Sequence, residues 1–511
     1  MTEQVLDPGR RTLVTIAVML AVLIQVLDTT IANVALPHMQ ASLGATQESV
    51  NWVLTSYIVA SAIAIPISGW LADKVGRKRL LILAVIGFTI ASLLCAIATS
   101  LTEMVIFRAI QGVTGAFLVP LAQATLFDIN PPERHARAMA LFGGGIMIGP
   151  IMGPVLGGWL TDSFNWRWVF LVNLPVGAIA TVMLLRYMPK SPLSARKFDI
   201  FGFALLGLAL GSLQLMLDRG QQLDWFDSWE IWVELGLCLG AAWMFVTHTL
   251  MSREPLFERG MFADRNFALG MFFMVVTGVL LLAGLALLPP LLQRLYGYSV
   301  FQSGLLTMPR GIGTLISMVL AGRLVGVVDL RILVASAMAL MAWSLHIMTG
   351  FAIDMGSGPI IVSGIIQGLG LGLMFVTVQS LAFATLVPRL RTHAASLLNL
   401  SRNIGGSIGI SVVAALLARN LQIAHADMAG AISDQVLPSM SGTVVSQLGL
   451  PAEAAVALAD AEINRQAAFI GYIDDFYLMM WVTLAAIPLV LLLRPAKQQA
   501  PGELHDAVAI D

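Results

Sequence analysis

Four ionisable residues lie inside long apolar stretches of the sequence: Asp28, Arg108, Arg310 and Arg402. A charged side chain at the centre of a bilayer costs a few kcal/mol or more, and such residues usually move ions or bind ligands. Asp28 lies about 12 Å from the nearer end of its stretch, at about 1.5 Å per helical residue, too deep for its short side chain to reach water. We therefore expect Asp28 to exchange protons; a carboxylate held permanently by a structural partner is the alternative.

The three arginines differ in their distance from the ends of their stretches. Arg310 is roughly 15 Å from either end, and the Pro and Gly residues beside it allow a helix to open around a cavity. Arg108 and Arg402 lie closer to an end, so extension of their side chains to the interface is the alternative to a buried role. We predict that Arg108 acts with Asp28 in proton exchange, and that Arg310 and Arg402 line a substrate cavity.

Uncharged polar residues share helix faces with these charged groups. Gln25 and Asn33 belong to a polar stripe beside Asp28, and Gln111 follows Arg108 by three residues, on the same face of a helix. The further cavity candidates are Gln25, Asn33, Gln111 and Gln367, the last of which repeats Gln111 later in the chain.

No motif for another chemistry is found. The sequence has no GxxxxGK[ST] phosphate loop and no HExxH zinc motif, and its glycines at 368–372 lie in an apolar stretch rather than after a strand. The seven histidines are scattered, and Cys95 and Cys238 lie in apolar runs. A net charge of −1 leaves no basic footprint for nucleic acid. We expect neither an enzyme, nor a cofactor or metal site, nor a nucleic-acid partner.

The elements that must position these residues are membrane-spanning helices. Of 511 residues, 58% are hydrophobic and 12% are charged, about half the usual charged share, so a soluble fold is excluded. A spanning helix needs about 20 apolar residues. Fourteen such segments are present, at 13–36, 50–71, 80–99, 102–127, 137–160, 168–187, 199–217, 230–250, 266–288, 302–322, 331–352, 359–384, 394–418 and 472–493. The predicted fold is therefore all-α and integral to the membrane.

The distribution of Lys and Arg predicts the orientation of these spans. With the N-terminus in the cytoplasm, most of the 29 Lys and Arg residues fall on the cytoplasmic side, as the positive-inside rule requires. Those on the outer side are Arg167, Arg219, Arg294, Arg419 and Arg465. An even number of spans returns the C-terminus to the cytoplasm. We predict a multi-pass protein of the plasma membrane, which is the inner membrane if the cell is Gram-negative.

A weak internal repeat divides the chain into halves. Gln111-Gly112 recurs as Gln367-Gly368, and Gly149 and Gly153 recur as Gly405 and Gly409, each time at the same offset. Duplicated halves around a midplane site are typical of secondary transporters. We predict a six-helix half at 1–187, a linker with two extra spans at 188–265, a second six-helix half at 266–495 and a cytoplasmic tail at 496–511. Residues 419–471 are predicted as a long outer loop, helical from Pro451, that is either a solvated connector or a docking surface.

Two glycine-containing motifs complete the candidate site. Between the second and third spans, Gly69, Asp73, Gly76 and Arg77 belong to a tight, highly charged loop, which we interpret as a cytoplasmic latch rather than an ordinary basic loop. In the fifth span, glycines four residues apart form a bare stripe that allows close helix packing. This motif comprises Gly145, Gly149, Pro150, Gly153, Pro154 and Gly157. The stripe suits either a static contact or a helix that slides during transport.

Together these motifs resemble the 14-helix drug:proton antiporters of the major facilitator superfamily, of the EmrB/QacA type. The resemblance covers about residues 10–495 and is carried by the segments 27–37, 69–79, 108–112, 149–158, 309–311 and 401–409. In that family the aspartate of the first span is taken as a proton or substrate site, and the arginine of the fourth span is linked to proton transfer. The glycine motif of the fifth span marks exporters rather than importers.

The resemblance implies the major facilitator fold, with two six-helix halves and two inserted helices, and alternating-access efflux of lipophilic small molecules or drugs in exchange for protons. It also implies that 419–471 meets a periplasmic adaptor protein, and through it an outer-membrane channel, if the source is Gram-negative. A dedicated exporter of one metabolite, such as a fatty acid or siderophore, is the alternative, and a transporter-fold sensor is disfavoured by the short polar tail after Leu493. The excess of Arg over Asp inside the spans favours weakly acidic substrates over large cations.

Overall fold

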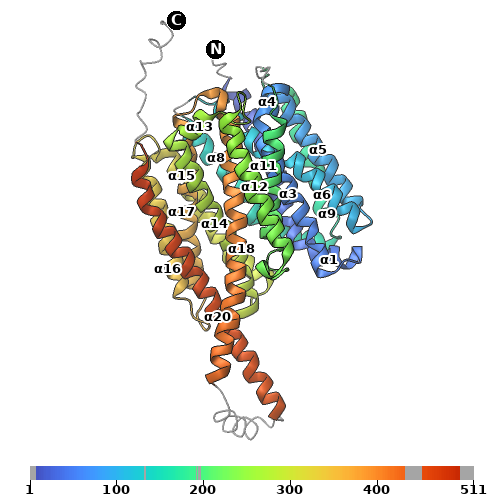
Figure 1. Ribbon diagram of the computed structural model, residues 1–511, viewed down its shortest axis with the longest axis vertical. Coiled ribbons are helices and arrows are strands. Elements are labelled where there is room, and N and C mark those ends of the chain that lie inside the picture. Colours follow the sequence, from blue (N-terminus) through green and yellow to red (C-terminus); the bar gives the residue numbers. More distant parts are fainter. Residues whose placement is uncertain (1–6, 132–133, 191–192, 194–196, 432–451, 495–511) are drawn as a thin grey trace.

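The computed structural model describes residues 7–131, 134–190, 193, 197–431 and 452–494, and these fold into a bundle of long helices (Figure 1). The first spans are α1 (Pro8–Leu43), α3 (Trp52–Ala64) continued by η1 (Ile65–Ile67) and α4 (Ser68–Val75), α5 (Arg77–Ile97), α6 (Leu101–Gly115) continued by α7 (Leu118–Ile129), α8 (His135–Ser163), and α9 (Trp168–Leu171) continued by α10 (Asn173–Tyr187). Two further helices follow, α11 (Ile200–Arg219) and α12 (Trp229–Met251).

The remaining spans begin after the short helix α13 (Arg259–Ala263). They are α14 (Arg265–Pro290) with the π-helical turn η4 (Leu291–Leu295), α15 (Val300–Leu324), α16 (Leu330–Thr349), α17 (Gly358–Ala384), α18 (Arg391–Ala431), and α20 (Ala452–Ala486) with η6 (Ile487–Leu492). The end of the bundle at which α1 starts and η6 ends is called the terminus end. The opposite end, beyond which α18 and α20 project, is called the stalk end (Figure 1).

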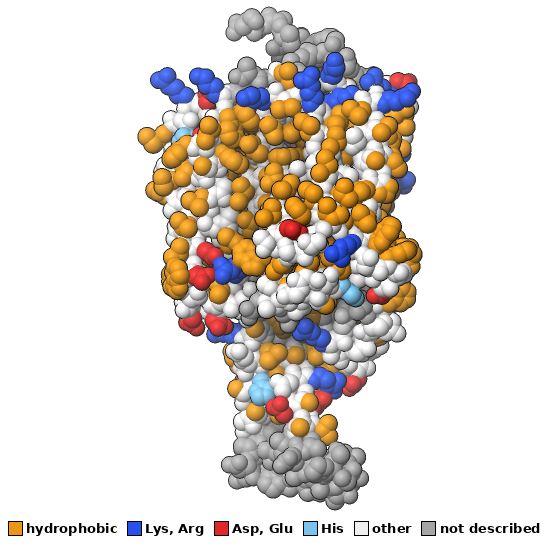
Figure 2. All heavy atoms as spheres, turned by 90° about the vertical axis from the view of Figure 1, so that its right-hand side faces the viewer, with side chains coloured by type: hydrophobic (Ala, Val, Ile, Leu, Met, Phe, Trp, Pro, Cys, Tyr) orange, Lys and Arg blue, Asp and Glu red, His pale blue; other side chains and the backbone are white. Residues whose placement is uncertain are grey.

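The prediction of fourteen spanning helices is confirmed. Thirteen helices among the described residues are long and apolar enough to cross a membrane. Helix α8 is the fourteenth, because its 29 residues include the stretch 138–161, which contains no charged side chain. An apolar belt crosses the face of the bundle seen in Figure 2, and Lys and Arg side chains gather at its terminus end. A belt of this kind is the surface that a bilayer covers.

The outer segment differs from the loop predicted at 419–471. Helix α18 continues beyond its predicted end to Ala431, whereas the helix predicted from Pro451 is present as α20, which begins at Ala452 and runs on into the last span. Two packed helices therefore extend as a stalk (Figure 1). The residues between them, 432–451, lie outside the described part of the chain. The apolar stretch marks only the length of a helix that lipid covers, and a helix can continue into water when it packs against a second one.

The internal repeat reappears in the helix contacts. In the first six spans, Gly112 of α6 lies directly against the backbone carbonyl of Tyr57 in α3. In the last six spans, Gly368 of α17 lies in the same way against the backbone carbonyl of Arg310 in α15. In each pair an added Cβ atom would overlap the opposing backbone, so only glycine permits this approach of the two helices.

A second pair of contacts follows the same plan. Gly149 of α8 lies against Val26 of α1, and Gly405 of α18 lies against the backbone of Val275 in α14. The two sets of six spans therefore use corresponding glycines to join corresponding helices, as expected for a duplicated architecture.

The two inserted helices lie on one side of this arrangement. Helix α11 packs against α3 from the first six spans and against α18 from the last six. Inside the membrane, Ser407 Oγ donates a hydrogen bond to Gln214 Oε1 at 2.9 Å, and Ser411 Oγ donates to the carbonyl of Leu217 at 2.7 Å. Helix α12 covers α11 and exposes most of its apolar surface. The inserted pair thus covers the seam between α3 and α18.

The close contact at Gly405 yields a prediction about stability. Substitution Gly405→Ala places a Cβ atom on the Val275 backbone, with the Val275 Cα atom only 2.7 Å away. We expect it to destabilise the protein by about 1–3 kcal/mol, because overpacking forces the two helices apart. Thermal unfolding of the purified protein in detergent measures this change.

The matched control is Gly158→Ala in α8, where an added Cβ would meet no atom within 4 Å. There the higher helix propensity of alanine should leave the protein unchanged or stabilise it by up to about 1 kcal/mol. Equal melting temperatures for the two variants would contradict the contact at Gly405.

Candidate functional site

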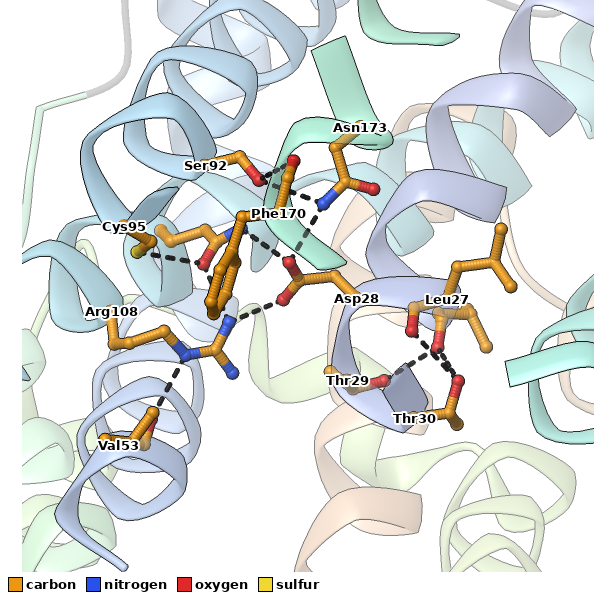
Figure 3. Close-up of polar contacts among 12 residues, drawn as sticks. Leu27, Asp28, Thr29, Thr30, Val53, Ser92, Cys95, Arg108, Phe170 and Asn173 are labelled. Carbon is orange, nitrogen blue, oxygen red and sulfur yellow. Dashed lines mark hydrogen bonds and ion pairs between the residues drawn. The ribbon is translucent and has the colours of Figure 1, made fainter. Parts of the chain in front are cut away.

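The candidate site is centred on Asp28, which is fully buried in α1. Its carboxylate accepts hydrogen bonds from Arg108 Nη1 at 2.5 Å, from Gln111 Nε2 at 2.8 Å and from Asn173 Nδ2 at 2.9 Å. The first two donors belong to α6 and the third is the first residue of α10, so three helices, α1, α6 and α10, meet at one carboxylate (Figure 3). Two of the residues predicted from the sequence, Arg108 and Gln111, are thus brought together with Asp28.

Arg108 turns into the protein instead of extending to the membrane interface. Its side chain is 1% exposed, Nε donates to the carbonyl of Val53 at 3.1 Å, and Nη1 also donates to Gln111 Oε1 at 2.7 Å (Figure 3). The guanidinium carbon lies 4.4 Å from the centre of the Tyr57 ring, within the range of a cation–π contact. Arg108 therefore keeps neutral partners even when Asp28 is not charged.

A second layer of polar groups orients these partners. Asn173 Nδ2 also donates to Ser92 Oγ at 2.9 Å, and Ser92 Oγ donates to the carbonyl of Phe170 at 3.0 Å (Figure 3). Asn173, Ser92 and Tyr57 were not predicted from the sequence. Each lies on a predominantly apolar helix, and no spacing along the chain indicates that these side chains meet at the level of Asp28.

The electrostatics of the pair suit a proton switch. Taking two opposite charges out of water costs several kcal/mol per ion, which their attraction and hydrogen bonds must offset. Removing one partner leaves an uncompensated buried charge, which is strongly destabilising. Protonation of Asp28 removes its charge and releases its hold on Arg108, so a single proton changes which contacts bind α1 to α6.

The two other polar residues predicted on α1 differ in position. Gln25 lies close to the Tyr57 hydroxyl, although neither Gln25 Oε1 nor Tyr57 Oη completes a hydrogen bond within the described residues. Asn33 is exposed and makes no contact with the buried pair. The polar stripe of α1 therefore does not form one continuous site.

Arg310 lines a cavity between the two sets of six spans. Its side chain is nearly buried, and Nη2 donates to the carbonyl of Leu281 in α14 at 3.1 Å. No carboxylate pairs with it among the residues that the structure describes. The cavity has a volume of about 640 Å³ including its mouth, and Met147 of α8 faces it from the first six spans. Its lining includes Leu281, Leu285, Leu288, Thr307, Arg310 and Leu371.

Two further cavity candidates, Gln367 and Arg402, do not line this cavity. Gln367 is buried within the last six spans, and its Oε1 atom has no hydrogen-bond donor in the described part of the protein. Arg402 is half-buried on α18, and its backbone carbonyl lies against Gly278 of α14. The structure therefore places a positive charge in the cavity at Arg310 alone among these candidates.

The predicted latch residues lie at the terminus end, where they meet α18. Gly69 lies on α4 against the ring of His393, and Asp73 Oδ2 lies 3.2 Å from His393 Nε2. Gly76 has a positive φ of 93°, which few residues other than glycine adopt, and it joins α4 to α5. Arg77 pairs with Asp128 at the end of α7. His393 was not predicted, although it is the residue on α18 that contacts both Gly69 and Asp73.

Asp128 extends these contacts across the molecule. It pairs with Arg77 from α5 and, at 3.1 Å, with Arg391 from the start of α18. Deeper in the bundle, Asn399 Nδ2 donates to Gln123 Oε1 at 2.6 Å. These bonds join the first six spans to the last six at the terminus end.

The glycine stripe of α8 faces α1. Gly145 lies against Met19, Gly149 against Val26, Gly153 against Thr30 and Gly157 against Ile31. The side chains of Pro150 and Pro154 lie outside those that the structure describes. The stripe thus places the backbone of α8 directly on the helix that carries Asp28.

One buried acidic group was missed from the sequence. Asp475 on α20 is fully buried, and neither of its carboxylate oxygens has a hydrogen-bond partner in the described residues. It lies within the predicted span 472–493, close to its outer end, and the sequence analysis did not single it out among the ionisable residues of the spans.

Comparison with known proteins identifies the family to which this architecture belongs. The family model of the Major Facilitator Superfamily matches residues 18–410. The multidrug export protein EmrB of Escherichia coli is 32% identical over 502 residues, covering 96% of this chain and 97% of that protein. The fatty acid resistance protein FarB of Neisseria gonorrhoeae is 33% identical, with the same coverage of 96% and 97%.

Solved structures share the fold at low sequence identity. The human organic anion transporter MFSD10 has a TM-score of 0.59 and 15% identity, covering 94% of this chain and all of that one. The proton:xylose symporter XylE has a TM-score of 0.56 at the same identity, covering 94% of this chain and 97% of its own. With fourteen spans, glycine contacts repeated in two halves and this family match, the chain belongs to the Major Facilitator Superfamily.

Proposed function

We propose that this protein is a proton-coupled antiporter that exports lipophilic small molecules by alternating access. The observation that carries the proposal is the fully buried Asp28–Arg108 pair, which a proton can separate without leaving Arg108 unpartnered. Multidrug exporters among its relatives, such as EmrB, support the same function. The match to a transporter family rather than to an enzyme family agrees with the lack of a catalytic motif.

We infer that the terminus end faces the cytoplasm. Lys and Arg side chains gather at this end, and the apolar belt separates them from the stalk end (Figure 2). The positive-inside rule then places both termini in the cytoplasm and the stalk outside.

In this orientation the structure corresponds to a conformation that is closed toward the cytoplasm. Asp128 joins Arg77 to Arg391, and Asp73 lies beside His393, so the two sets of spans are held together at the cytoplasmic end. A proton from outside neutralises Asp28 in this conformation. The release of α1 from α6 then favours opening of the cytoplasmic end, where Asp28 loses the proton and substrate enters the cavity.

The cavity favours lipophiles that carry a negative charge. Its lining is mainly aliphatic, and Arg310 supplies a positive charge that no described carboxylate neutralises. An anionic head group placed beside Arg310 would gain a charge-assisted hydrogen bond while its apolar part fills the cavity. A dedicated exporter of a fatty acid is the second candidate, which the relative FarB supports by its name.

The stalk is the place at which an external partner would bind. Helices α18 and α20 project beyond the rest of the bundle at the proposed outer end (Figure 1). In a Gram-negative cell we propose that this stalk meets a periplasmic adaptor protein, which connects the exporter to an outer-membrane channel.

The proton switch leads to a prediction for Asp28→Asn. The variant cannot change charge, so substrate should no longer drive proton flux, whereas substrate binding should persist. Purified protein in liposomes with an internal pH dye measures this flux. The control is Asp162→Asn, which removes an exposed aspartate near the outer end of α8 and should behave as wild type. Normal substrate-driven proton flux by Asp28→Asn would exclude Asp28 as the coupling site.

The cytoplasmic contacts lead to a prediction for Asp128→Asn. Loss of a half-exposed ion pair worth roughly 1 kcal/mol should shift the protein toward the open form about fivefold. A cysteine introduced at the buried Ala395 of α18, with Cys95 and Cys238 replaced, should then be alkylated correspondingly faster.

The matched control for this experiment is Glu230→Gln, which weakens an ion pair with Arg219 at the opposite end. It should leave the alkylation rate at Ala395→Cys unchanged. If Asp128→Asn did not accelerate alkylation, the proposed role of these contacts in closing the cytoplasmic end would be wrong.

The charge in the cavity leads to a prediction for Arg310→Gln. Transport of a weakly acidic lipophile should fall about tenfold or more, because a charge-assisted hydrogen bond contributes about 1.5–3 kcal/mol. Transport of a cationic dye should not fall, which a competition assay in liposomes can test. Arg323→Gln, at the exposed end of the same helix, is the control. An equal loss for acid and cation would show that Arg310 does not select by charge.

A further inference from the structure

Asp475 lies in an environment that is unusual for a carboxyl group. It is fully buried on α20, and Tyr472, Phe476 and Met479 of the same helix are buried as well. The ring of Phe476, the next residue, packs edge-on against Phe351, with centroids 6.2 Å apart. Both carboxylate oxygens lack a hydrogen-bond donor within the described residues.

The contrast with Asp28 shows what is missing. Asp28 is equally buried, but Arg108, Gln111 and Asn173 all donate hydrogen bonds to it. Asp475 has the same burial and none of these donors, so a negative charge costs more free energy on Asp475 than on Asp28.

The neighbouring residue provides a second contrast. Asp474 is exposed, and it accepts a hydrogen bond from Asn420 Nδ2 of α18 at 3.3 Å. Of these two consecutive carboxyl groups, that of Asp474 is therefore exposed to solvent and that of Asp475 is buried.

Among the residues that the structure describes, no Lys, Arg or His forms an ion pair with Asp475. On η4, Arg294 is exposed, and its charge acts on Tyr472. On α18, Arg419 is exposed beside Asn420. The titratable groups nearest the end of α16, His346 in its last turn and Asp354 in the following loop, are exposed as well.

An unpaired carboxylate in such surroundings is too costly to persist, because burial of an isolated charge favours the neutral form. We propose that Asp475 is a second proton-binding site, filled from the outer compartment and separate from the coupling site at Asp28. The proposal rests on the antiport function and outward-facing stalk inferred above. Asp474 is exposed, so solvent reaches the residue next to the buried carboxyl group along α20.

The bound proton keeps the outer part of the last span in place. Neutral Asp475 allows α20 to remain packed against α16 and α18, the helices that surround it. Loss of the proton creates a buried negative charge that only water or movement of α20 can relieve. Helix α18 also carries Arg391 and His393, which form the contacts at the cytoplasmic end, and α20 continues into the stalk. The pH of the outer solution therefore acts on the cytoplasmic contacts through α18 and on the stalk through α20.

The test uses Asp475→Asn, which reproduces a protonated carboxyl in shape and charge. Wild-type transport in liposomes, at a fixed proton gradient, should fall as the outer solution becomes alkaline, since occupancy of a single proton site falls about tenfold per pH unit above its midpoint. Asp475→Asn should lose this fall while exchanging the same number of protons per substrate. Asp474→Asn, the matched control, should keep the wild-type profile.

A readout that does not depend on transport separates this proposal from the proposed function. The infrared band of a protonated carboxylic acid should be present in the purified wild-type protein at neutral pH and weaker in Asp475→Asn. An unchanged band, or failure of Asp475→Asn to fold at neutral pH, would overturn the proposal. So would a wild-type pH profile in Asp475→Asn. Absence of substrate-driven proton flux in the wild type would instead overturn the antiport function.

Discussion

The low dielectric constant inside the bundle governs how this protein holds its charges. Arg108 and Asp28 are both withdrawn from water, and each is stable only while it has its partners. Those partners come from α3, α6 and α10, so these helices must meet α1 at a single point to satisfy them. The proposed response to protons rests on the same requirement, because a proton on Asp28 would change the interactions that hold these helices together.

Asp28 and Arg108 do not line the cavity at Arg310, so in the proposed antiport the effect of a proton on Asp28 must travel through helix contacts. The helix that carries Asp28 also carries Val26 and Thr30, and Thr30 Oγ1 donates to the carbonyl of Gly149 in α8 at 3.3 Å. Two residues away on α8, Met147 faces the cavity that Arg310 also lines. Bare glycine contacts bring the backbones of α8 and α1 close together. In the antiport that we propose, this contact is the physical connection between the proton site and the cavity.

Much of this could be predicted from the sequence, because the relevant signals are local or periodic. Apolar length defines the fourteen spans, the repeated glycines define corresponding helix pairs, and a charge in an apolar stretch marks Asp28 and Arg108 without any structure. The same reasoning was less successful for Arg402 and Asn33. Their types and spacing match those of the site residues, but the direction in which a helix faces depends on neighbours that the sequence does not reveal.

The two buried aspartates show where sequence reasoning ends. Asp28 and Asp475 have the same side chain and the same complete burial, yet three donors bind the carboxylate of Asp28 and none of the described residues donates to that of Asp475. The donors for Asp28 lie 80 to 145 residues away in the chain, so only the fold decides which aspartate has them. A carboxylate paired with a cation can bind a proton in place of that ion pair. A buried carboxyl group without such a partner either keeps its proton or forces its helix to move, and on this difference rest our two proposals, coupling at Asp28 and sensing at Asp475.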